Sequence, residues 1–233
     1  ASHGLVSLGI VLLMRSGVVS FGQGLVFSAG GYCAALAFNH LGVTDALLLA
    51  LIGGLAALLV AAPFAPLLAR YRGIFFAMLT LALSMVCYGV LVKTTSLGGS
   101  DGFNMGRPTL LGQSLSDERV AYVLYAVTIS VAGVLALLAR VYFDSTRGLV
   151  AQAVRENELR VEYLGGSVRQ SVALNFCMAA FAGGCGGALT VMSLGHIDPN
   201  FSYWTTSGEF VFVDILTCSQ SGVAGFVAST LPE

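Results

Sequence analysis

Apolar runs about as long as a lipid bilayer is thick are the feature that most constrains the fold of this chain. Residues 73–93, 119–142 and 168–194 carry few charges, and those few lie near the ends of each run. A helix needs about 20 apolar residues to cross the hydrocarbon core, where every backbone N–H and C=O must be hydrogen-bonded within the protein. We therefore expect an all-α, polytopic helical membrane protein.

The composition favours the same class. The chain has 233 residues, of which 56% are hydrophobic and 10% are charged, whereas a soluble domain carries about 25% charged residues. Too little polar surface is available to cover a water-soluble globule. The net charge of −1 argues against a nucleic-acid partner, because binding to a phosphate backbone needs a basic surface. The partner that the composition indicates is the lipid bilayer.

About seven apolar segments follow one another along the chain, and several are too short or too interrupted for one straight span. Residues 4–20 contain Arg15, and residues 45–69 contain Pro63 and Pro66, where we expect a bend. Residues 168–194 are split by four glycines between 183 and 187, for which we favour close helix packing. We expect broken or re-entrant helices among these segments, which are residues 4–20, 22–38, 45–69, 73–93, 119–142, 168–194 and 208–230.

The basic residues predict the orientation, since short cytoplasmic loops are enriched in Lys and Arg. Arg70 and Arg72 share one short loop, and further arginines gather between residues 140 and 169. The spans between these two regions place them on the same side, which we assign as cytoplasmic. The amino terminus is then expected outside and the carboxyl terminus inside. The other loops expected outside are residues 39–44, 94–118 and 195–206.

Residues 142–170 form a polar, arginine-rich island between two apolar runs, and such an island must lie in water. We expect two short helices in it. Ser145 can cap the first and Asn157 the second, and Gly165 can end the second as the glycine that follows a helix. Composition alone favours a docking surface and an ordinary cytoplasmic loop equally.

The sequence contains no motif for catalysis or nucleotide binding. It has no G-x-x-x-x-G-K-[ST] phosphate loop, no G-x-S-x-G elbow and no C-x-x-C pair, and its histidines lack metal-ligand spacing. We therefore expect no enzyme activity, and no metal or cofactor bound by this chain. Polar residues inside apolar segments are functional candidates by default, and here they are Arg15, Gln23, Glu209 and Asp214.

Five pieces of the sequence, in order, resemble the motifs of one family. That family comprises the permease subunits of branched-chain amino-acid ABC importers, which are high-affinity amino-acid transporters. The pieces together extend over most of the chain. They are residues 20–32 (SFGQGLVFSAGGY), 72–82 (RGIFFAMLTLA), 97–102 (LGGSDG), 155–158 (RENE) with Leu164 and Gly165, and 195–199 (GHIDP).

The resemblance implies one transmembrane permease domain over residues 1–233 of a multi-pass protein of the plasma membrane, the bacterial inner membrane. The chain is shorter than a typical member, so we expect at least one span to be missing at each end. Residues 143–169 would be a cytoplasmic coupling loop that docks on a separate ATPase subunit, where ATP is bound. The residues expected to make this contact are Arg155, Glu156, Asn157, Glu158, Glu162 and Gly165.

The resemblance also implies further partners. They are two ABC ATPase subunits, a second permease subunit that is homologous or identical, and a periplasmic or extracellular substrate-binding protein. The residues expected to contact the binding protein are Gly98, Gly99, Ser100, Asp101 and Gly102. A candidate substrate path is formed by Gly22, Gln23, Gly24, Gly30 and Gly31. The alternative role for these glycines is close helix packing.

The expected function is translocation of branched-chain or similar small amino acids, with urea or short amides as alternative substrates. The alternative function is a self-contained, ion-coupled secondary transporter or a channel for small solutes. That function would need intramembrane carboxylates, and Glu209 and Asp214 are the candidates. The chain departs from the family pattern at residues 214–225, where members usually carry a Gly-Gly pair.

Overall fold

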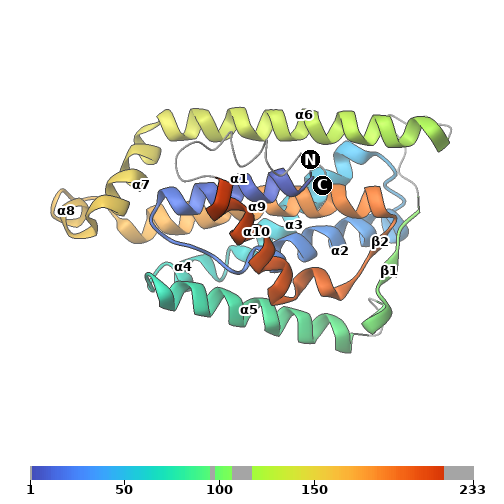
Figure 1. Ribbon diagram of the computed structural model, residues 1–233, viewed down its shortest axis with the longest axis horizontal. Coiled ribbons are helices and arrows are strands. Elements are labelled where there is room, and N and C mark those ends of the chain that lie inside the picture. The colour runs from blue at the N-terminus through green and yellow to red at the C-terminus, as the bar shows by residue number, and fades with distance from the viewer. Residues whose placement is uncertain (1, 95–97, 107–116, 218–233) are drawn as a thin grey trace.

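The structure, a computed structural model, describes residues 2–94, 98–106 and 117–217; the side chains of 2, 117–121 and 214–217 are outside this description (Figure 1). The described residues are mostly helical, as the apolar runs predict. The α-helices are α1 (Ser2–Arg15), α2 (Gln23–Leu41), α3 (Ala46–Ala61), α4 (Ala65–Leu68), α5 (Ile74–Lys93), α6 (Asp117–Asp144), α7 (Thr146–Glu156), α8 (Glu158–Tyr163), α9 (Val168–Leu194) and α10 (Trp204–Thr217). Two 3-10 helices, η2 (Gly99–Asp101) and η3 (Pro199–Ser202), and two short strands, β1 (Phe103–Asn104) and β2 (His196–Ile197), complete the described elements.

Three of these helices are long and apolar enough to cross a membrane, namely α5, α6 from Tyr122 onward, and α9, and two shorter apolar helices are α1 and α3. The ribbon places α6 along one side and α5 along the other, with α9 between them (Figure 1). Most of α9 is buried, whereas α5 and α6 expose most of their residues. This distribution is expected for a helical bundle whose outer helices face lipid.

Helix α9 is the centre of the core, because it packs against α1, α2 and α3. Small residues allow these close contacts, as they do in membrane helix pairs generally. A Cβ atom added to Gly184 would lie 2.7 Å from the carbonyl oxygen of Gly53 on α3, and one added to Gly30 would meet the backbone of Gly184. The prediction that the α9 glycines serve close helix packing is therefore confirmed. The prediction that they split this span is wrong, because α9 continues through them as one helix.

The predicted breaks near proline and arginine are confirmed. Helix α3 ends at Ala61, and the four-residue α4 follows it with a proline in its first turn. Helix α1 ends at Arg15, and residues 16–22 lead to α2 without helical structure. Proline lacks a backbone N–H and fixes φ, so α3 cannot continue through Pro63.

The loops lie at the two ends of the bundle, in the two sets that the charge distribution predicts. At one end, Arg72 forms an ion pair with Glu158, with 3.0 Å between Nε and Oε1, so the short basic loop meets the island. At the other end, β1 pairs antiparallel with β2, and Asn39 Nδ2 donates to the carbonyl oxygen of Asn104 at 3.0 Å. Residues from all three loops expected outside thus meet at the end opposite the island.

One of those loops differs from the prediction. Residues 195–206 were expected to remain outside, yet η3 turns back into the interior and packs against α2 and α5. Ser202 is fully buried there and bonds to Ser84, in the middle of α5. The Ser84 hydroxyl donates to the Ser202 carbonyl and the Thr206 hydroxyl donates to the Asn200 carbonyl, and such bonds allow irregular backbone to enter the interior.

Candidate coupling surface and buried polar centre

The first helix of the island, α7, begins at a capped residue and is fixed to the end of α6. The Ser145 side-chain oxygen accepts from the Gly148 N–H at 3.4 Å and donates to the Tyr142 carbonyl oxygen at 2.5 Å. An N-cap serine satisfies one of the backbone donors left free at a helix start. The direction in which α7 leaves the membrane is therefore determined by the last turn of α6.

The second island helix, α8, is capped at both ends. Asn157 Oδ1 accepts from the Arg160 N–H at 3.0 Å. At the other end the Gly166 N–H bonds to the Val161 carbonyl, the Gly165 N–H bonds to the Glu162 carbonyl, and Gly165 has a φ of 82°. This pair of bonds with a left-handed glycine is a Schellman motif. The three capping residues expected from the sequence are confirmed in these roles.

A small apolar cluster holds both island helices to the first turn of α9. Val154 on α7, Val161 on α8 and Val168 on α9 are buried together, and the partly buried Val150 packs against them. The Arg72–Glu158 ion pair attaches α8 to the loop between α4 and α5 instead. Its side chains are 27% and 45% exposed, and an ion pair this accessible contributes at most about 1 kcal/mol. The valine cluster is therefore the main link between the island and α9.

The outer surface of the island remains uncovered. Leu159 is 66% exposed and Leu164 is 81% exposed, and Tyr163 between them is 89% exposed. We define these three residues as the coupling surface. Among the residues expected to contact an ATPase, Arg155, Glu156, Asn157, Glu162 and Gly165 are exposed around it, while Glu158 is half-buried by Arg72. Exposed apolar side chains with a polar rim are typical of a protein-binding surface.

Sequence reasoning missed Tyr163 and Arg72. A large aromatic side chain just before a helix-ending glycine was an available signal for Tyr163, because aromatic residues are enriched at protein interfaces. No linear signal pairs Arg72 with Glu158, since the two lie on loops far apart in the sequence.

A buried polar centre lies at the break between α1 and α2. The Phe21 N–H donates to Thr80 Oγ1 at 3.1 Å, and the Gly22 N–H donates to Ser20 Oγ at 3.1 Å. Ser20, Gln23 and Thr80 are each 1% exposed. Helix α2 therefore starts inside the protein, and side-chain hydroxyls satisfy the irregular backbone that precedes it.

The start of α10 joins this centre from the opposite side. The Gly24 N–H donates to Ser207 Oγ at 2.9 Å, and Ser84 Oγ donates to the Ser202 carbonyl at 2.8 Å. A Cβ atom added to Gly24 would lie 2.6 Å from Ser207 Oγ and 2.9 Å from the Phe201 carbonyl oxygen. Two irregular segments thus meet in the interior, and glycine is required where they approach.

Gln23 has an unfilled hydrogen-bonding position. Its Oε1 atom is buried and has no hydrogen-bond partner among the described residues. This atom faces the middle of α9, because a Cβ atom on Gly183 would lie 3.3 Å from it. A buried acceptor without a partner costs about 1–3 kcal/mol, so a donor at this position would be favourable.

The five residues expected along the substrate path therefore occupy two different environments. Gly22, Gln23 and Gly24 lie in the polar centre, as described. Gly30 and Gly31 lie further along α2, where a Cβ atom on Gly31 would meet Ile197 Cδ1 at 2.6 Å and Val191 Cγ2 at 2.8 Å. These two glycines occupy helix contacts rather than the polar centre.

The residues expected to contact a binding protein form a tight turn at the end of the bundle opposite the island. Gly98, Gly99 and Gly102 all have positive φ, at 86°, 57° and 75°. Ser100 and Asp101 are exposed, whereas Gly99 is buried. Strand pairing between Phe103 and Ile197 fixes the turn to the end of α9.

The intramembrane candidates whose side chains the structure describes lie in different surroundings. The Arg15 guanidinium lies 4.0 Å from the centre of the Phe143 ring, near the island. This cation–π contact accounts for the arginine at the end of an apolar helix. Glu209 is exposed on α10, and the side chain of Asp214 lies outside the described residues. The part of the chain that the structure describes contains no cluster of His, Cys, Asp or Glu able to hold a metal ion.

Long apolar helices, a core held together by glycine contacts, and irregular segments that meet at a buried polar centre define an integral membrane permease. The chain matches the family of branched-chain amino acid transport system permease components over residues 1–228, and it belongs to that family. As a permease component of an ABC-type transport system, it is not itself catalytic. No curated protein and no solved structure matches the chain individually.

Proposed function

We propose that this chain is the membrane-spanning subunit of an ABC importer for branched-chain or similar small amino acids. The observation that carries the proposal is the attachment of the exposed coupling surface to α9 through the valine cluster. Docking of an ATPase subunit on α7 and α8 would displace the first turn of α9, the helix that packs against α1, α2 and α3. Residues 143–169 are then the cytoplasmic coupling loop within one permease domain.

The buried polar centre is the proposed substrate contact, formed by Gly22, Gln23 and Gly24 with the neighbouring hydroxyls. The N-terminus of α2 carries a partial positive charge that suits a carboxylate, and Gln23 Oε1 accepts a hydrogen bond from an ammonium group. Helices around the centre supply apolar walls for a small side chain. Urea or a short amide would use the same acceptor without the carboxylate contact.

The proposed complex contains two ATPase subunits, which bind the ATP, a second permease subunit that is identical or homologous, and a substrate-binding protein outside. Membership of the family implies an ABC transporter complex. The exposed turn at Ser100 and Asp101 supports an external docking site, and the coupling surface supports a cytoplasmic one. The bacterial inner membrane is the proposed location.

The energy source tests the proposal directly. Vesicles containing the assembled complex are expected to accumulate leucine when ATP is supplied, and to show no uptake on a proton or sodium gradient alone. Asp214→Asn is expected to leave the ATP-driven uptake largely intact, because no step of the proposed mechanism binds an ion there. Uptake that runs on a gradient alone and is abolished by Asp214→Asn would establish ion coupling instead.

A cysteine at Ser100 tests the outer docking site. Ser100→Cys is expected to react with a membrane-impermeant thiol reagent from outside, and to crosslink to the substrate-binding protein, because this side chain is exposed on the turn after Gly99. Thr94→Cys, on the same side of the protein at the end of α5, provides the matched control for labelling without crosslinking. Labelling of Ser100→Cys from the cytoplasmic side alone would reverse the topology.

A further inference from the structure

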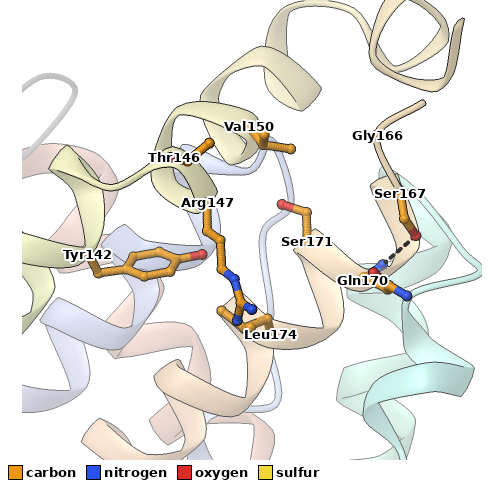
Figure 2. A pocket seen from close by; sticks show the side chains of 9 residues that line it. All are labelled: Tyr142, Thr146, Arg147, Val150, Gly166, Ser167, Gln170, Ser171 and Leu174. Atoms are coloured by element: carbon orange, nitrogen blue, oxygen red, sulfur yellow. Dashed lines mark hydrogen bonds between the residues drawn. The ribbon is translucent and has the colours of Figure 1, made fainter. Parts of the chain in front are cut away.

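A cavity lies at the elbow where the island joins the membrane-embedded helices. Its volume is about 430 Å³, and it is bounded by the end of α6, the first turns of α7 and the start of α9 (Figure 2). No Asp or Glu is among the residues that line it. The lining residues are Tyr142, Thr146, Arg147, Val150, Gly166, Ser167, Gln170, Ser171 and Leu174.

Hydrogen-bond donors without partners gather around this cavity. The Arg147 side chain extends from α7 toward α9 (Figure 2), and within the described residues it forms no ion pair. Ser171 Oγ is a buried atom with no hydrogen-bond partner. One turn further along α9, Asn175 is 1% exposed, and its Nδ2 also lacks a partner, while its Oδ1 accepts from the Tyr142 hydroxyl.

This set of groups favours an anion. The guanidinium carries a positive charge, the Ser171 hydroxyl offers a donor, and the first turn of α9 adds the partial positive charge of a helix N-terminus. Donors left unpaired in a buried place are unfavourable, so an acceptor bound among them would be stabilised. Arginine with hydroxyl groups is a common arrangement for binding phosphate.

An apolar groove adjoins this cavity and is lined by residues of the apolar helices α1, α3, α6 and α9. It has a volume of about 290 Å³ and shares Leu174 with the first cavity. From Leu174 to Phe181 it follows α9 for about 10 Å, at 1.5 Å of rise per residue. Its other side is formed by Leu135 and Leu138 on α6. A charged pocket beside an apolar groove suits one lipid molecule, with the headgroup in the pocket and an acyl chain in the groove.

We propose that the cavity and the groove together bind one anionic phospholipid of the cytoplasmic leaflet. Its phosphate would contact Arg147 and Ser171, and an acyl chain would lie between Leu138 and Phe181. Basic pockets between membrane helices on the cytoplasmic side bind such headgroups. A soluble partner would not follow an apolar groove into the bilayer. The bound lipid would join α7 to α9 and so stiffen the elbow behind the coupling surface. An effect of this stiffening on transport rests on the proposed function, whereas the lipid site itself does not.

Lipid binding to the assembled, delipidated transporter tests the site without any transport measurement. Vesicles of phosphatidylglycerol and of phosphatidylcholine would be offered in turn, and retained phospholipid counted by native mass spectrometry. The wild type is expected to retain phosphatidylglycerol in preference. Arg147→Gln is expected to bind it about tenfold more weakly, because a charge-assisted contact is lost. The matched control is Arg169→Gln, which changes an arginine in the first turn of α9 that does not line the cavity and should therefore behave as wild type.

A second variant separates lipid from free phosphate. Leu138→Trp fills the groove but leaves the charged pocket unchanged, so it should lower retention of phosphatidylglycerol. If inorganic phosphate alone raises the melting temperature equally in wild type and Leu138→Trp, a free anion rather than a lipid is bound. Equal retention by Arg147→Gln and wild type would overturn the site. An assembled complex that retains no phospholipid, because a second permease subunit covers the groove, would also overturn it.

Discussion

Replacing both Leu159 and Leu164 with glutamate should abolish stimulated ATP hydrolysis and uptake while leaving the permease folded. Both side chains are mostly exposed, so their loss removes little burial within this chain. Truncation of a hot-spot residue at the centre of an interface costs about 2 kcal/mol or more of binding free energy, and an introduced carboxylate adds a desolvation cost. The measurement is ATPase activity and leucine uptake in the reconstituted complex, with the melting temperature as the test of folding.

The matched control for this double variant is Gln152→Glu, which adds a carboxylate to an exposed position of α7 without removing an apolar side chain. It should retain most of the activity. Glu156→Arg combined with Glu162→Arg tests the charged rim in the same assay. Glu158 is a poorer choice, because its ion pair with Arg72 would be broken as well. Normal coupling in the Leu159 and Leu164 double variant would exclude this surface as the docking site.

Gly30→Ala should cause a large loss of folded protein. The added Cβ atom would lie 2.5 Å from the Gly184 Cα and 2.7 Å from its carbonyl carbon. These are backbone atoms of the central helix, so α2 and α9 would have to separate. Overpacking of this kind typically costs about 1–3 kcal/mol, and more where backbone must move. The measurement is the yield and melting temperature of the detergent-solubilised protein.

Gly133→Ala on α6 is the matched control, since a Cβ atom at that position meets nothing within 4 Å. It should fold as well as the wild type. The comparison also distinguishes the two roles that the sequence leaves open for Gly30. A Gly30→Ala protein with normal stability but altered leucine affinity would assign this glycine to the substrate path rather than to packing.

Local signals in the sequence predicted much of the coupling region. A serine, an asparagine and a glycine act through hydrogen bonds to their nearest neighbours, so Ser145, Asn157 and Gly165 could be assigned without knowledge of the tertiary structure. The apolar segments were predictable for a similar reason. Length and hydrophobicity are local properties, and α5, α6 and α9 follow the expected runs closely.

The sequence alone did not predict contacts between segments that lie far apart in the chain. Ser202 lies in a polar stretch that reads as a surface loop. Its burial depends on a hydrogen bond to Ser84, which lies 118 positions away in the chain. The same holds for the elbow cavity, whose lining comes from three helices. In the sequence Arg147 is only one of the arginines between residues 140 and 169, because nothing local indicates that it lines one cavity with Ser171.

The unbroken course of α9 has a mechanical consequence. Its 27 residues measure about 40 Å at 1.5 Å per residue, enough to connect the island with the outer strand pair. The valine cluster packs against the first turn of α9, and β2 follows its last turn. A tilt imposed at the island end of α9 therefore moves the strand-pair end in the opposite direction, because a rigid helix turns about its glycine contacts in the middle. A gate built on this helix would open at one face as it closes at the other.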